Sequence, residues 1–376
     1  MFSFIVKLAA DQILQRYRMK KSERVYVQNR KPKHRKINAL RTTLLVVAIL
    51  LTATILIILF DKSGGEPGLS SEISLSPSSI GSSSSESLIT ESLISDSDIS
   101  RPSRDAAFSQ LKEDLQVFAD SFNGRIGISY INLTNGEKFS VHEQLPFVAA
   151  SSIKMSIVTQ LYNSIAAGDL TLTQTLKYDS RPYPEGDYEA GSGIIANEPN
   201  GTEFSVGRTA QLAVTISDNC ATNMIIRALG GIDSIVPHLN EISANVPYRE
   251  EVKYSNYKGI LQKGRHRTCS SDLAAYAAHL YELWKSDEEA YGVLMNDLQN
   301  TIFDFGLQSL LPDDVKVAHK IGTNNAYRAE NDVGIIFADE PYVLCVMTET
   351  ENQSDGRSAL AQVSLMFYEY ITSLYD

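Results

Sequence analysis

Two residues near the middle of the chain, Ser151 and Lys154, have the types and the spacing of a nucleophile and its base. They stand three residues apart at the expected start of a helix, so both side chains lie on one helix face. The helix N-terminus favours negative charge that develops on the serine. A lysine removed from water loses its proton more easily and can then accept the serine proton. The same spacing recurs at 109–112 and 255–258, so the pair alone does not identify a site.

Two further polar segments add hydroxyl and amino groups that could take part in the same chemistry. Ser217-Asp218-Asn219 interrupts the apolar run 213–226, and Lys320-Ile321-Gly322-Thr323 comes before an apolar, strand-like run. A polar triplet inside an apolar helical run must satisfy its polar groups or serve a site. A helix cap formed by Ser217 or Asp218 is the structural alternative for the first segment.

The three segments follow one another along the chain as Ser-x-x-Lys, Ser-Asp-Asn and Lys-x-Gly. In this order and at this approximate spacing they resemble the motifs of the class A β-lactamases and penicillin-binding serine peptidases. The flanking residues agree with the family: Phe147 and Ala150, then Ala221 and Asn223, then Asn331–Ile336. The resemblance covers residues 105–376. It implies an α/β (α+β) fold, in which an antiparallel sheet is flanked by helices and carries an inserted all-helical lobe.

The resemblance also implies a catalytic role for each motif residue. Ser151 would attack the carbonyl of a β-lactam or of a D-alanyl-D-alanine peptide and form an acyl-enzyme. Lys154 would act as base or proton relay, and Ser217 would pass the proton to the leaving nitrogen. Asn219 would order Lys154 and the substrate amide. Lys320 would supply positive charge beside Ser217 and the substrate carboxylate.

Further residues are assigned to substrate binding by the same resemblance. The backbone N–H groups of Ser151 and Thr323 would form the oxyanion hole, with Gly322 beside them. An aromatic residue from the loop that follows the catalytic helix often borders the cleft in this family, which indicates Tyr188. The resemblance implies no metal ion and no cofactor.

The sequence departs from the family in the middle of its third motif. The family has a hydroxyl residue there that helps to hold the substrate carboxylate, whereas this chain has Ile321. We expect Thr323 or Arg328 to take over that contact.

The second departure concerns removal of the acyl group. Class A enzymes carry a loop glutamate that activates the deacylating water. Counting along the family's spacing from Ser217 reaches Lys253, with Glu250 and Glu251 just before it. A shift in register would allow either glutamate to serve, and the alternative is that both are solvated loop charges. Without such a base the acyl-enzyme should persist, which is typical of a penicillin-binding protein.

The elements that must position these residues can be predicted from hydrophobic periodicity and turn residues. Helices are expected at 105–122, at 151–167 with Gly168 at its end, and at 358–375. A hairpin is expected from 124–133 and 138–142, and two more strands from 332–338 and 342–348, with mostly helical structure up to about residue 310. Strands at both ends of the domain predict one sheet with a helical lobe inserted into it.

The first part of the chain has a different composition. Residues 42–60 contain no charge, and a helix of this length spans about 28 Å, close to the hydrocarbon thickness of a bilayer. A buried core helix and a cleaved signal peptide are the alternatives. The preceding basic segment, 1–41, should stay cytoplasmic, which places the catalytic domain outside the cell membrane of a single-pass protein. The Ser-rich segment 61–104 should be a flexible linker.

The remaining composition narrows the class of protein. The formal net charge is −11, and the acidic main domain argues against nucleic-acid binding. Three cysteines form neither a disulfide scaffold nor a metal motif.

Taken together, the motifs, the resemblance and the uncharged segment predict a membrane-anchored serine hydrolase that acts on a β-lactam or a peptidoglycan-stem peptide. A D,D-peptidase-like penicillin-binding protein with slow deacylation and a non-catalytic wall-sensing receptor are the alternatives. The sequence does not predict an oligomeric state.

Overall fold

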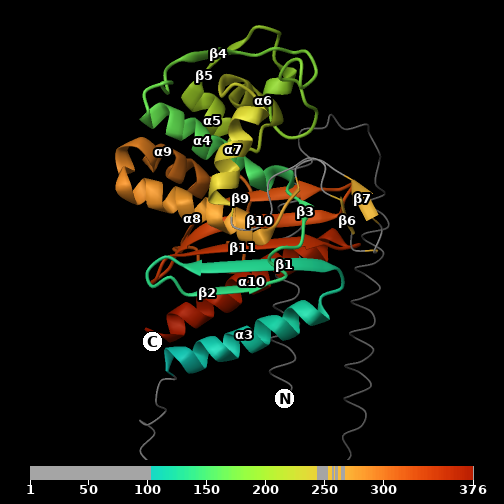
Figure 1. The fold of residues 1–376 in the computed structure, drawn as a ribbon, viewed down its shortest axis with the longest axis vertical. Coiled ribbons are helices and arrows are strands. Elements are labelled where there is room, and N and C mark those ends of the chain that lie inside the picture. The colour runs from blue at the N-terminus through green and yellow to red at the C-terminus, as the bar shows by residue number, and fades with distance from the viewer. Residues whose placement is uncertain (1–102, 244–252, 256–257, 259–260, 264–266, 376) are drawn as a thin grey trace, which may run out of the picture. The chain divides into compact units, whose positions relative to one another are not determined.

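The computed structural model describes residues 103–375 with four gaps, at 244–252, 256–257, 259–260 and 264–266 (Figure 1). Residues 1–102 lie outside the described residues. They include the predicted segments 1–41 and 42–60 and nearly all of the predicted linker 61–104. Within the described part of the chain, no helix is long and apolar enough to cross a bilayer.

A five-stranded antiparallel sheet forms the centre of the domain, in the strand order β2-β1-β11-β10-β9. Its first two strands come from the start of the domain and the other three from its end, which confirms the prediction of one sheet built from both ends (Figure 1). The strand bounds are β1 Arg125–Asn132, β2 Lys138–Val141, β9 Lys316–Asn324, β10 Ala329–Phe337 and β11 Tyr342–Glu349.

Strand β9 was not expected from the sequence, although it carries the third motif. It contains His319, Lys320 and Gly322, residue types that are not typical of a strand. The strand nevertheless forms because it pairs along its whole length with β10, and Val333 lies opposite Lys320. The third motif therefore stands on an edge strand of the sheet.

Helices cover both faces of this sheet (Figure 1). Helix α3 (Arg104–Ser121) and helix α10 (Gln353–Ser373) lie on one face, where Tyr130 of β1 stacks on Phe367 with ring centroids 4.4 Å apart. Helix α8 (Ser270–Ser286) packs on the other face, and helix α9 (Glu288–Gln299) packs against β9. Helix α3 begins and ends within one residue of its predicted bounds, whereas α10 begins at Gln353 and not at the predicted residue 358.

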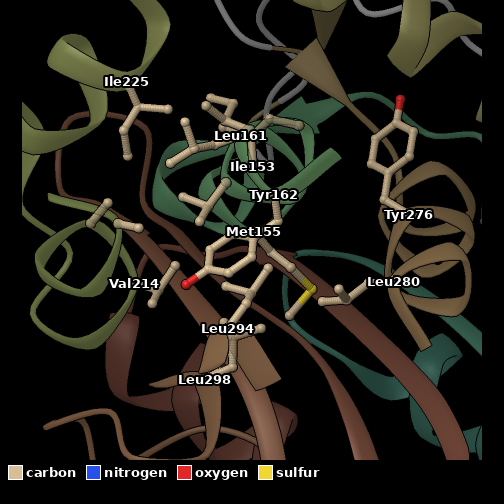
Figure 2. Close-up of a cluster of buried hydrophobic side chains, with 14 of the residues drawn as sticks. Ile153, Met155, Leu161, Tyr162, Val214, Ile225, Tyr276, Leu280, Leu294 and Leu298 are labelled. Carbon is tan, nitrogen blue, oxygen red and sulfur yellow. The ribbon is translucent and has the colours of Figure 1, made fainter. Parts of the chain in front are cut away.

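The helical lobe is built around helix α4 (Lys154–Ala166), which follows a 3-10 turn, η1 (Ala150–Ile153). The first nine residues of α4 are all buried, so the helix is enclosed by its neighbours rather than lying on the surface. Figure 2 shows apolar side chains such as Met155, Leu161 and Leu294 packed together in this core. The surrounding helices are α5 (Val206–Thr215), α6 (Asn219–Ala228) and α7 (Ile232–Ile242), together with α8 and α9.

The prediction of mostly helical structure up to residue 310 missed several short strands. Each has two or three residues, too few for a periodic pattern, and forms by pairing with another short strand. The pairs are β3 (Phe147–Val148) with β8 (Arg267–Thr268), β4 (Thr175–Lys177) with β5 (Glu203–Ser205), and β6 (Lys253–Ser255) with β7 (Leu261–Lys263); a second 3-10 turn, η2, spans Ile195–Asn197.

Candidate active site

Ser151 lies in the turn η1 at the entrance to the buried helix α4. Its side chain is partly exposed, whereas the neighbouring Ser152 is buried and donates its hydroxyl to the Ala149 carbonyl at 2.6 Å. Ala150 adopts the left-handed backbone conformation, with φ +48°, which is uncommon for a residue with a side chain. The fold therefore presents Ser151, and not Ser152, as the accessible hydroxyl at the start of the helix.

Lys154 lies one turn further along, almost completely buried at 6% exposure. Its Nζ donates to the Ser217 carbonyl at 2.7 Å, to Ser217 Oγ at 3.3 Å and to Asn219 Oδ1 at 2.7 Å. Burial lowers the pKa of this lysine to about 8, against the opposing influence of the Asp218 and Glu189 carboxylates. All three acceptors are neutral, and no carboxylate among the described residues bonds directly to this ammonium group.

The Ser217-Asp218-Asn219 triplet combines the two interpretations that the sequence left open. Asp218 caps helix α6, because its Oδ1 accepts the Ala221 N–H at 2.9 Å. The residues on either side hold Lys154 instead. Ser217 has φ +57°, and this left-handed conformation is maintained by the surrounding structure.

A loop that precedes β5, residues 179–201, wraps around the same triplet. Asn219 donates its side-chain amide to the Ala190 carbonyl at 3.2 Å and its backbone N–H to the Ser192 carbonyl at 3.0 Å. A Cβ at Gly191 would lie 2.9 Å from Asn219 Nδ2, and one at Gly193 only 2.2 Å from the Asp218 side chain. The two glycines let the loop backbone approach the triplet this closely.

The loop is also fixed to helix α6 by a two-fold ion pair. Arg227 donates to both oxygens of the fully buried Asp187 carboxylate, at 2.9 and 2.8 Å. Tyr188 follows directly and is 38% exposed. The structure thus places Tyr188 on the loop that contacts Asn219.

Lys320, on the edge strand β9, is the second buried ammonium group of the site, at 1% exposure. Its Nζ donates to the Ile321 carbonyl at 2.9 Å and lies 5.4 Å from the centre of the Phe303 ring. Burial lowers its pKa well below the usual value, the positive charge of Lys154 lowers it further, and Asp332 opposes both.

Gly322 lies directly against the turn that carries Ser151. A Cβ at this position would be 2.6 Å from the Ser152 nitrogen, 2.7 Å from the Ala149 oxygen and 3.1 Å from the Ser151 nitrogen. Asn331 of β10 fixes the same turn by donating to the Val148 and Ala149 carbonyls, at 2.8 and 3.2 Å. The glycine therefore allows the edge strand to pack against the backbone N–H of Ser151.

The other predicted residues lie in varied surroundings. Thr323 is half-buried beside Gly322, Ile321 is buried, and Arg328 is exposed in the turn between β9 and β10 with φ +58°. Glu250 and Glu251 lie outside the described residues.

Some residues at the site carried no pattern that the sequence could reveal. The Phe303 ring lies against the Lys320 ammonium, and the Glu189 carboxylate raises the pKa of Lys154. His319 and Asp332 form a fully buried pair, with His319 Nδ1 2.8 Å from Asp332 Oδ2. In the described ranges, no group of histidines, cysteines and carboxylates is arranged to hold a metal ion. All three cysteines are buried and free.

The site therefore joins an accessible serine, a buried lysine of lowered pKa, a second hydroxyl and a second ammonium group. A lysine that is partly neutral near pH 8 can accept the proton of a serine hydroxyl, and the serine can then attack a carbonyl carbon. The arrangement has the parts needed for nucleophilic acyl transfer.

Comparison with known proteins identifies similar chains over the whole domain. A profile described as the beta-lactamase enzyme family matches residues 110–371. Beta-lactamase SME-1 of Serratia marcescens is 26% identical over 259 residues, which cover 68% of this chain and 84% of the relative. The solved structure of PBP-A has a TM-score of 0.59 at 24% identity and covers 70% of this chain and 96% of PBP-A. A mutant of PBP-A, solved as an acyl-enzyme complex with penicillin G, has the same TM-score and identity and covers 97% of that chain.

Proposed function

Because the chain belongs to the beta-lactamase enzyme family and is thus a serine hydrolase, we propose that it opens β-lactam rings through an acyl-enzyme on Ser151. The geometry around Lys154 is the observation that carries the proposal. A buried lysine held by three neutral acceptors, with a pKa of about 8, is partly unprotonated at neutral pH. It lies one helical turn from an accessible serine.

The proposed acylation begins when neutral Lys154 accepts the proton of Ser151 Oγ. The oxygen attacks the lactam carbonyl carbon, and the negative charge that develops on the carbonyl oxygen is stabilised by the backbone N–H groups of Ser151 and Thr323. Ser217, whose Oγ is 3.3 Å from Lys154 Nζ, passes the proton on to the leaving nitrogen. The carbon–nitrogen bond then breaks and the ring opens, which leaves an ester on Ser151.

Lys320 and the loop 179–201 are proposed to bind the substrate. The buried ammonium group of Lys320, on strand β9 beside Gly322, supplies positive charge for a substrate carboxylate. Ile321 has no hydroxyl for this carboxylate, so Thr323 or Arg328 would provide the remaining contact. Tyr188 would border the cleft from the loop that Asn219 holds in place.

A D,D-peptidase of the penicillin-binding type is the second candidate function. Lys253 stands where the family spacing calls for a deacylating glutamate, which favours a slowly cleared acyl group. The likeness to PBP-A, a mutant of which was solved as an acyl-enzyme with penicillin G, supports the same alternative. The two functions differ in the rate at which water removes the acyl group from Ser151.

Steady-state assays on the full-length chain test the proposal. We expect penicillin G to be consumed by the wild type and not by Ser151→Ala. Ser156→Ala is the matched control, because Ser156 lies on the same helix and its buried hydroxyl has no hydrogen-bond partner in the part of the chain that the structure describes. Penicillin turnover by Ser151→Ala would refute the proposal. Release of D-alanine from a D-alanyl-D-alanine peptide, without consumption of penicillin, would favour the peptidase.

We also propose that residues 42–60 anchor the enzyme in the cell membrane, with 1–41 in the cytoplasm, 61–104 as a linker and the catalytic domain outside. The uncharged stretch and the basic segment before it support this topology. Protease added to intact cells without a wall should digest the catalytic domain and spare a tag at the N-terminus. Digestion of the tag instead would reverse the orientation.

A further inference from the structure

The ester on Ser151 must be cleared by water if the proposed β-lactamase reaction is to turn over, and this inference rests on that proposed function. Water attacks an ester efficiently only when a base takes its proton. A carboxylate near Lys154 is the natural candidate. Within the described ranges, the carboxylates of Asp218 and Glu189 raise the pKa of Lys154.

Asp218 is not available for this task. Its carboxylate is fully buried, and both of its oxygens already accept backbone hydrogen bonds. Oδ1 accepts from Ala221 at 2.9 Å, and Oδ2 accepts from Ile194 at 2.6 Å and Ile195 at 3.0 Å. The Asp218 carboxylate is thus enclosed by three N–H donors and has no oxygen facing water.

Glu189 is placed differently. It is exposed, and Asn223 donates its side-chain amide to Glu189 Oε2 at 3.2 Å. Asn223 is itself buried, at 4% exposure, so it offers a fixed point of attachment. On helix α6, Asn223 lies one turn after Asn219, whose Oδ1 accepts a hydrogen bond from Lys154 Nζ at 2.7 Å. The carboxylate is therefore tied to the helix face that holds Lys154, and its second oxygen is left for water.

The backbone around Glu189 is fixed as firmly as the side chain. The Glu189 N–H donates to Cys220 Sγ at 3.4 Å, and the next carbonyl, that of Ala190, accepts the amide of Asn219 at 3.2 Å. Asp187, two residues earlier, is clamped by Arg227. Such support on both sides is what a catalytic group on a loop requires in order to keep its position.

We propose that Glu189 is the general base that activates the deacylating water. Its carboxylate takes one proton from the water while the water oxygen bonds to the acyl carbonyl carbon. The bond between that carbon and Ser151 Oγ then breaks, and the proton held by Glu189 returns to the serine oxygen. The product leaves as a carboxylic acid, and both residues regain their starting states. Lys154 serves acylation and Glu189 serves deacylation.

A Glu189→Gln variant of the full-length chain separates these two steps. Glutamine keeps an oxygen for Asn223 but cannot take a proton. Because the Glu189 carboxylate raises the Lys154 pKa, its loss leaves more neutral lysine, so acylation should be unchanged or slightly faster. Deacylation should fall roughly 100-fold or more, the usual loss when a general base is removed. A residue with a purely structural role would slow both steps together.

Stopped-flow mixing with penicillin G measures the acylation burst, and intact-mass spectra over time measure the surviving adduct. Glu198→Gln, another exposed glutamate of the same loop, is the matched control and should behave as the wild type. If Glu189→Gln clears its adduct as fast as the wild type, the inference is wrong. A wild-type adduct that lasts as long as the variant's also refutes it and leaves the peptidase function standing. If the wild type neither forms an adduct nor consumes penicillin G, the proposed function itself is refuted, and the inference with it.

Discussion

Substitution of Gly322 by alanine tests whether the edge strand positions the nucleophile. The added Cβ would lie 2.6 Å from the Ser152 nitrogen and 2.7 Å from the Ala149 oxygen, and both are backbone atoms. To restore an ordinary separation of about 3.4 Å, the turn and the strand must part by roughly 0.8 Å. A displacement of this size at a reacting group costs about 100-fold in rate.

The stability of the domain should suffer much less than its activity. Overpacking of this kind costs about 1 to 3 kcal/mol of unfolding free energy, which a folded domain commonly tolerates. The assay is kcat/KM for penicillin G, with urea denaturation followed by circular dichroism to show that the variant is folded. Gly292→Ala on helix α9 is the control, because the nearest atom to its Cβ is a flexible side-chain carbon 3.8 Å away.

The expected result is a folded Gly322→Ala enzyme with about one hundredth of the activity and an unaltered Gly292→Ala enzyme. If Gly322→Ala keeps a third or more of the wild-type activity, the backbone contact does not position Ser151 and the reasoning fails. If the variant is inactive because it does not fold, the burial of the strand and not the site would account for the loss.

The buried lysines and the loop clamp should respond to pH and to substitution. Since Lys154 has a pKa of about 8, the acylation rate should rise about tenfold from pH 7 to pH 9 in stopped-flow assays, and a falling rate would contradict its role as base. Lys320→Met removes an ammonium group that burial disfavours, so unfolding free energy in urea should increase by about 1 kcal/mol while turnover is lost; a less stable variant would argue against this. Arg227→Ala leaves the buried Asp187 carboxylate without its cation and should cost about 3 kcal/mol, against less than about 0.5 kcal/mol for the exposed Arg208→Ala; equal losses would show that the clamp contributes nothing.

The sequence predicted the fold well where long periodic segments decide it. The terminal helices follow from hydrophobic periodicity, and four of the five sheet strands follow from short apolar runs and turn residues. Strand β9 could not be predicted in this way because Lys320 and Gly322 are residue types that are uncommon in strands. Its existence depends on pairing with β10, which no local pattern reveals.

The site, too, has a part that the sequence predicts and a part that only the folded structure reveals. The motif order brought Ser151, Lys154 and Asn219 to attention, and the structure places their groups within one helical turn or hydrogen-bond distance. No local pattern explains Gly191 and Gly193, because the contact that requires both glycines comes from a segment more than twenty residues away. Such contacts arise only when the chain is folded.

The central claim is that Ser151 carries the acyl group, and intact-mass spectrometry of the full-length chain tests it most directly. The chain is mixed with penicillin G, quenched in acid within seconds and digested, so that the peptide containing Ser151 can be sequenced. The account predicts one penicillin-derived adduct on Ser151 of the wild type, the same adduct on Ser156→Ala, and none on Ser151→Ala. An adduct that persists in Ser151→Ala, or that maps to another residue of the wild type, would contradict the account.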